Sequence, residues 1–256
     1  MTEQPLKVWS ERDGALLRLR LARPKANLID AAMIAALDPV LSASLADSRL
    51  KGVLLDHEGP HFSFGASVEE HLPDQCAEML AGIHGLLLRL LGSPVALMVA
   101  VNGQCLGGGL EVAVTGHRIF AAPGARFGQP EIKLGVFAPF ASCILPERMM
   151  RGSAENLLLS GLPITAEEAL RTGLVDAVSA DPAAAALAWF DEALAPHSPS
   201  SLRFAVRAAR FDLVERVRLK LATLEQLYLT DLMATRDALE GLTGFIEKRP
   251  VAWEGR

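Results

Sequence analysis

The chain has 256 residues, of which 50% are hydrophobic and 21% are charged, so it can fold around a sizeable core. Its formal net charge of −5 and its lack of a basic run argue against nucleic acid as a partner. Three widely spaced cysteines without a metal-ligand pattern, no apolar leader and no apolar run long enough for a bilayer predict a cytoplasmic protein with no structural metal and no membrane contact.

Strands and helices are expected to alternate until the C-terminal part, where helices follow one another. Strands are predicted at residues 7–11, 16–21, 51–56, 95–101, 118–121, 126–128 and 174–178. The first two flank Asp13-Gly14, a turn dipeptide, and should form a hairpin with one solvent-facing side. Helices are predicted at residues 30–48, 75–91, 110–115, 165–173, 182–194, 202–210 and 214–247.

The last helical segment carries an apolar stripe that can face either the core or a second subunit. At helical spacing, the stripe consists of Leu213, Val217, Leu221, Leu224 and Tyr228. The order of elements predicts an α/β protein with residues 1–195 as its core and residues 196–256 as a helical extension used for oligomerisation.

Three consecutive glycines, Gly107 to Gly109, stand between the strand expected at 95–101 and the next helix. Glycine destabilises the interior of both kinds of element, so the run needs a reason. One reason is a turn that packs the strand closely against the helix, and the spacing alone favours this explanation over a ligand site. The other is a site where a ligand reaches the N–H groups that open a helix and stabilise negative charge.

Four motifs occur in order along the chain: residues 23–27 (RPKAN), 62–67 (FSFGAS), 102–111 (NGQCLGGGLE) and 127–131 (FGQPE). Together they resemble the crotonase (enoyl-CoA hydratase/isomerase) superfamily over nearly the whole chain. The resemblance implies a spiral of repeated ββα units with a C-terminal helical trimerisation region. It also implies an acyl-CoA thioester substrate, a homotrimer or dimer of trimers, and no cofactor apart from the CoA of the substrate.

The resemblance assigns two kinds of group to the reaction. It places the thioester oxygen between the backbone N–H groups of Ala66 and Gly108, which form an oxyanion hole. It gives Glu111 and Glu131 the positions of the two catalytic glutamates of family hydratases. Hydration needs one group that takes a proton from water and one that delivers a proton to carbon, and two carboxyl groups suit this task.

The CoA moiety is expected to contact two segments beside the oxyanion hole and the C-terminal helix of a neighbouring subunit. By the resemblance, the contact residues are Lys25, Ala26, Ser67, Val68, Phe245 and Lys248. Ser67 stands where family members commonly carry Asp, so this sequence departs from the family pattern at that position.

A second departure follows Glu131, where ordinary family hydratases often have a glycine-rich turn. Here residues 136–141 read VFAPFA, and bulky apolar side chains favour a compact ring over a linear acyl chain. Residues 61–73 (HFSFGASVEEHLP) and 135–139 (GVFAP) resemble family hydratases that act on a cyclic dienoyl-CoA. The resemblance therefore implies a hydro-lyase that adds water to a conjugated cyclic dienoyl-CoA. A straight-chain enoyl-CoA hydratase or isomerase, and a binding protein that has lost the chemistry, remain alternatives. The presence of both glutamates argues against the second of these.

Overall fold

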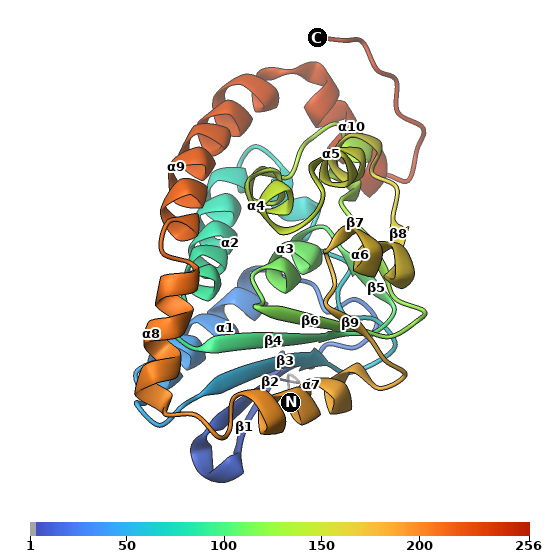
Figure 1. Ribbon diagram of the computed structural model, residues 1–256. Coiled ribbons are helices and arrows are strands. Elements are labelled where there is room, and N and C mark those ends of the chain that lie inside the picture. The colour runs from blue at the N-terminus through green and yellow to red at the C-terminus, as the bar shows by residue number, and fades with distance from the viewer. Residues whose placement is uncertain (1–3) are drawn as a thin grey trace.

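The computed structural model describes residues 4–256, which form two β-sheets surrounded by helices (Figure 1). Within these residues the larger sheet has six strands, in the spatial order β1 (Leu6–Glu11), β2 (Leu16–Leu21), β3 (Gly52–His57), β4 (Ala96–Val101), β6 (Arg118–Ala121) and β9 (Ala177–Val178). The smaller sheet contains β5 (Gln104–Leu106), β7 (Arg126–Gly128) and β8 (Ile164–Thr165). In the larger sheet β1 and β2 form the expected antiparallel hairpin, and the other neighbours are parallel.

Most helices lie close to the predicted ranges, but no range was predicted for α4 and α5, and the prediction fails near the C-terminus. The helices are α1 (Ala31–Ser44), α2 (Cys76–Leu91), α3 (Gly108–Val114), α4 (Pro139–Arg148), α5 (Arg151–Ser160), α6 (Ala166–Thr172), α7 (Pro182–Ala193), α8 (Pro199–Ala209), α9 (Leu213–Gln226) and α10 (Arg236–Ile246). The single helix predicted at 214–247 is wrong. A π-helical turn and a 3-10 turn end α9, and Thr235 caps a new helix by accepting a hydrogen bond from the N–H of Ala238.

Alternate residues of the larger sheet enter two different cores. On β4, Leu97, Val99 and Val101 face the larger core, which α1, α2 and α3 help to form. Ala96, Met98 and Ala100 face the opposite side, where α7 packs. A strand buried on both faces is what the continuous apolar sequence of β4 predicts.

The prediction that one side of the β1–β2 hairpin faces solvent is partly wrong. Arg18 on β2 is only 5% exposed. It donates hydrogen bonds to Asp56 (2.6 Å) and to Glu11 (2.8 Å), and its guanidinium lies over the ring of Trp9. These partners compensate the charge, so an arginine can occupy a covered position on a strand.

Successive units of the chain place one strand in each sheet and then a helix. The strand β4 lies in the larger sheet, β5 lies in the smaller sheet, and α3 follows; β6, β7 and α4 repeat the pattern. In the unit before them, Ser63 follows β3 and precedes α2 in the chain, and it forms an isolated parallel bridge to Cys105 of β5. This arrangement is the spiral of ββα units that the family resemblance implies.

The C-terminal helices pack against the rest of the protein. Figure 1 shows α9 running alongside α2 and α4, and its residues contact both helices. Val217, Leu221 and Tyr228 of the apolar stripe are buried in the larger core, so this stripe faces the protein interior. None of the helices in residues 4–256 combines the length and apolar character that a membrane-spanning segment needs.

Candidate active site

Two backbone N–H groups meet where the segment after β3 crosses the start of α3. A Cβ atom built on Gly108 would lie 3.2 Å from the nitrogen of Ala66, so the two amides are neighbours. Neither amide donates a hydrogen bond to another group of residues 4–256. Two unpaired donors side by side can bind one ligand oxygen together.

Gly107 joins the smaller sheet to α3 in a conformation that suits glycine. Its φ is 49° and its ψ is −129°, and a Cβ atom here would lie 2.7 Å from Oε1 of Glu131. A side chain would therefore strain the backbone and also displace the carboxyl group. One role of the glycine run is thus to let Glu131 approach the turn before α3.

Glu111 and Glu131 come from different ββα units. Glu111 lies in the first turn of α3, and Glu131 lies in the 3-10 helix η3 (Pro130–Leu134) after β7. Oε1 of Glu111 accepts a hydrogen bond of 2.8 Å from the N–H of Ala141 in α4. Oε2 of Glu131 is buried and has no hydrogen-bond partner among the described residues. One carboxyl group is therefore held by the backbone, and the other keeps an oxygen available to a ligand.

Both carboxyl groups and both amides line one small cavity. Its volume is about 20 Å³, which is the space that about one water molecule occupies. The lining residues are Ala66, His71, Met79, Leu80, Ile83, His84, Gly108, Glu111, Glu131, Phe137, Ala138, Pro139 and Tyr228. The structure thus brings together the four residues that the sequence analysis predicts for the reaction.

The environment of the cavity raises the pKa of both glutamates. Burial and the nearby charge of Glu111 raise the pKa of Glu131 to about 8, so this carboxyl group keeps its proton at neutral pH. Burial also raises the pKa of Glu111, but His84 and the N–H of Ala141 favour its ionised form. The surroundings therefore make Glu131 the better proton carrier and Glu111 the better supported anion.

Sequence reasoning missed His84, Tyr228 and Met79, which line the same cavity. His84 lies on the apolar helix α2, and its Nδ1 is 2.5 Å from Oε1 of Glu225 on α9. Tyr228 ends the apolar stripe, whose periodicity predicts only packing. The sequence offers one other sign that Tyr228 is unusual, since it is the single tyrosine of the chain.

A model of the enoyl-CoA hydratase/isomerase family matches residues 11–256. The chain belongs to this family. It is 63% identical over 252 residues to the cyclohexa-1,5-dienecarbonyl-CoA hydratase of Thauera aromatica, an alignment that covers 98% of each chain. It is 32% identical to the 2,3-dehydroadipyl-CoA hydratase of Escherichia coli K12, with 96% of this chain and 97% of the relative covered.

Solved structures bear out the fold at lower identity. A crystal structure of an enoyl-CoA hydratase from Bacillus halodurans superposes with a TM-score of 0.86 at 22% identity and covers 94% of this chain and 99% of its own. The crotonase fold expected from the four motifs is therefore confirmed.

The residues expected to bind CoA in this family lie outside the small cavity. Ala26 lies beside the segment of residues 62–67, called here the oxyanion segment because Ala66 is its predicted oxyanion donor. The carbonyl of Ala26 accepts a hydrogen bond of 2.9 Å from the N–H of Phe64. Lys25 precedes it with a positive φ of 91°, and Ser67 and Val68 directly follow Ala66. Phe245 on α10 is 57% exposed. Lys248 follows the end of that helix, and neither residue lines the cavity.

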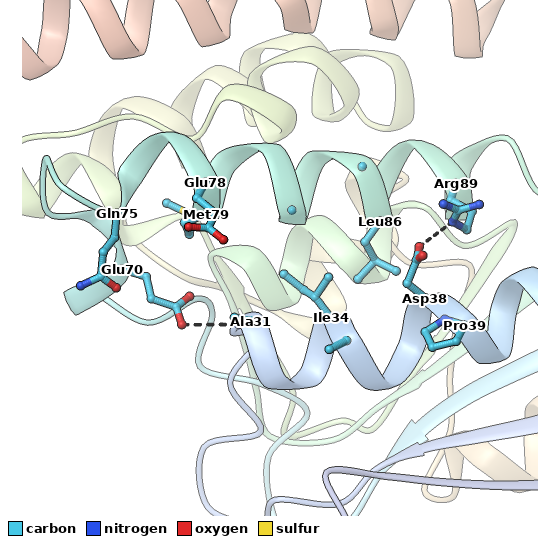
Figure 2. A pocket seen from close by; sticks show the side chains of 13 residues that line it. Ala31, Ile34, Asp38, Pro39, Glu70, Gln75, Glu78, Met79, Leu86 and Arg89 are labelled. Atoms are coloured by element: carbon cyan, nitrogen blue, oxygen red, sulfur yellow. Dashed lines mark hydrogen bonds and ion pairs between the residues drawn. The ribbon is translucent and has the colours of Figure 1, made fainter.

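A larger groove of about 580 Å³ runs between α1 and α2 on the other side of Met79 (Figure 2). In Figure 2, Ile34 and Leu86 point toward each other across it, and Arg89 pairs with Asp38 at one end at 2.6 Å. Met79 is the one residue that lines both the groove and the small cavity within residues 4–256. In this member of the enoyl-CoA hydratase/isomerase family, the flexible side chain of Met79 is therefore common to the walls of both spaces.

Proposed function

We propose that the protein hydrates cyclohexa-1,5-diene-1-carbonyl-CoA to 6-hydroxycyclohex-1-ene-1-carbonyl-CoA, a step of anaerobic benzoyl-CoA degradation. The observation that carries this proposal is the 63% identity to the Thauera aromatica hydratase over 98% of both chains. The paired glutamates beside two unpaired amides supply chemistry suited to that reaction.

The amides of Ala66 and Gly108 bind the thioester oxygen. When water adds to the carbon β to the thioester, electrons move onto this oxygen and a dienolate forms. Two preorganised N–H groups stabilise that charge more than they stabilise the neutral thioester, which lowers the barrier. Removing one such donor typically costs about 3 kcal/mol of transition-state stabilisation.

The two glutamates move the protons. Glu111, as the anion, takes a proton from water while the water oxygen bonds to the β carbon. Glu131 gives its proton to the far end of the conjugated system, which collapses the dienolate to the product. Proton exchange then restores the starting state, and the same groups work in reverse for dehydration.

The apolar side chains in the wall of the site suit a hydrocarbon acyl group. Met79 lines both the cavity and the groove between α1 and α2, and Phe137 also lines the cavity. A ring needs less depth than a long chain, which would have to pass Met79.

The CoA moiety and the assembly complete the proposal. CoA contacts Lys25, Ala26, Ser67 and Val68 beside the oxyanion segment, and Phe245 and Lys248 reach it from a neighbouring subunit. A homotrimer or a dimer of trimers fits the many large apolar side chains exposed in the C-terminal part, namely Phe204, Phe211, Leu219, Leu227, Leu229, Leu239 and Phe245. No metal or bound cofactor takes part in the proposed steps.

The test compares hydration rates on cyclohexa-1,5-diene-1-carbonyl-CoA and crotonyl-CoA in one preparation. We expect a strong preference for the cyclic diene, and a rate loss of about a thousandfold in both Glu111→Gln and Glu131→Gln. A preference for crotonyl-CoA would instead indicate a straight-chain hydratase. Turnover of neither thioester would contradict hydratase activity.

A further inference from the structure

Tyr228 is a buried polar residue whose hydroxyl group has no role in the fold. The residue lies in the π-helical turn η4 (Leu227–Asp231) that follows α9 and is 1% exposed. Its hydroxyl has no hydrogen-bond partner among residues 4–256. A buried hydroxyl without a partner costs free energy, so its retention points to a ligand that completes its bonding.

The side chain of Tyr228 forms part of the wall of the catalytic cavity. Tyr228 lines that cavity together with Glu111 and Glu131. The ring of Phe137 packs against it edge-on, with 5.3 Å between ring centroids. Oε2 of Glu131 is also without a partner among the described residues, so the two groups do not satisfy each other.

The surroundings of Tyr228 keep its phenol in the neutral form. Burial raises its pKa, and the nearby Cys76, Glu131 and Glu111 raise it further. A phenol in such surroundings keeps its proton, so it can orient an oxygen atom but is a poor proton-transfer acid.

The reaction proposed above leaves one oxygen atom for this donor. The thioester oxygen is bound by the amides of Ala66 and Gly108, and the rest of the unsaturated acyl group is hydrocarbon. We propose that the Tyr228 hydroxyl donates a hydrogen bond to the water oxygen before addition and to the new substrate hydroxyl after it. Tyr228 is then a third catalytic residue, which touches the oxygen that is transferred.

This inference rests on a hydration reaction but not on the identity of the acyl group. It predicts that Tyr228→Phe changes the affinity for the hydrated thioester but not the affinity for the unsaturated one, because only the hydrated thioester carries the hydroxyl. In a Glu111→Gln background, which suppresses turnover, the second change should weaken binding of the hydroxyacyl-CoA about tenfold. Binding of the unsaturated acyl-CoA should stay the same.

Isothermal calorimetry measures this contrast with two pairs of thioesters. One pair is the cyclic diene and its 6-hydroxy product, and the other is crotonyl-CoA and 3-hydroxybutyryl-CoA. A contrast in either pair supports the role of Tyr228, whereas the substrate proposal depends on which pair the wild-type protein turns over. The inference would be overturned if Tyr228→Phe changed none of the four affinities. It would also be overturned if the affinities for the unsaturated and the hydrated thioester fell equally in each pair.

Stability provides an independent readout. Tyr228→Phe keeps the ring and its contact with Phe137 and removes only the unpaired hydroxyl, so the melting temperature should stay level or rise. Phe137→Leu is the matched control, because it weakens the packing of the ring but keeps the hydroxyl. It should lower the melting temperature and reduce the affinity for both members of a pair alike. A fall in melting temperature for Tyr228→Phe as large as in this control would instead assign Tyr228 to packing.

Discussion

At the scale of single residues, Glu131 shows how burial prepares a side chain for chemistry. Its carboxyl group lies in the cavity with Glu111, without a hydrogen-bond partner on Oε2 in the described residues. Both burial and the neighbouring carboxylate disfavour charge on it, and its pKa rises to about 8. The folded protein therefore carries a proton at neutral pH that the unfolded chain releases.

This proton makes stability depend on pH in a predictable direction. From about pH 4.5 to about pH 8 the folded state binds the proton and the unfolded state does not, so stability falls as the pH rises. The contribution of Glu131 to the slope is at most about 1.4 kcal/mol per pH unit. Glu131→Gln should remove it, as denaturant unfolding at several pH values would show. The exposed Glu155→Gln on α5 should follow the wild type, and an unchanged slope in Glu131→Gln would contradict the assignment.

Gly107 provides a second prediction. Gly107→Ala puts a methyl group 2.7 Å from Oε1 of Glu131 and forces a non-glycine residue to positive φ, which costs about 1–3 kcal/mol. The displaced carboxyl should lower kcat about a hundredfold. Steady-state kinetics and thermal unfolding test this.

The matched control is Gly152→Ala, whose added methyl group meets no atom within 4 Å on helix α5. It should keep full activity and gain about 0.5–1 kcal/mol of stability. Normal turnover by Gly107→Ala would show that Glu131 does not need this approach.

Residues at the site could be predicted where a motif carries them. Ala66, Gly108, Glu111 and Glu131 all lie in short runs that resemble the family, and the structure brings these four together. Tyr228 lies in no such motif. Its position depends on where a distant helix docks, and local periodicity describes it only as a packing residue.

At the scale of elements, helix α2 decides how deep the acyl site is. One face of the helix turns Met79 and Ile83 toward the cavity, and another face lines the groove with Leu86. Gly82 and Gly85 leave that groove open, since they carry no side chains. Met79 is therefore the residue of α2 at which the depth of the site can be tested.

Met79→Ala should join the two spaces and admit longer linear chains. We expect the ratio of kcat/KM for decenoyl-CoA to that for crotonyl-CoA to rise at least about tenfold. The deletion of a buried methionine should also cost about 2–5 kcal/mol of stability. Leu86→Ala is the control, because it widens the groove at a similar cost without opening the cavity. An equal rise in both variants would exclude Met79 as the barrier.

Most elements could be predicted from local patterns, and the exceptions have physical causes. Strand β5 is too short to show a period, and its pairing with β7 comes from the fold. The segment between α9 and α10 keeps a helical composition, so the π-helical turn and the cap at Thr235 are not visible in the periodicity. Arg18 looks like a surface residue until Asp56 and Glu11 are known to face it.

At the scale of the whole molecule, the exposed apolar residues of the C-terminal part argue for association. Phe204 is 69% exposed and Phe211 is 85% exposed. The boundary between a core of residues 1–195 and an oligomerisation region of residues 196–256 stays a prediction, because α9 also packs closely on α2 and α4.

The oligomer can be tested by charge substitution. Light scattering should give the native protein a mass near three or six times 27.4 kDa, and Phe204→Glu with Phe211→Glu should give single chains. Val8→Glu, on the edge strand β1, should leave the assembly intact. A native protein that is already monomeric would contradict both the assembly and the sharing of CoA contacts between subunits.

The position of helix α9 also affects how the protein matures. A growing chain that ends before residue 213 already contains both glutamates and both amides, but it lacks Tyr228 and the helix that packs on α2 and α4. Tyr228 can therefore join the wall of the cavity only after the last part of the chain has been made and has folded onto the rest.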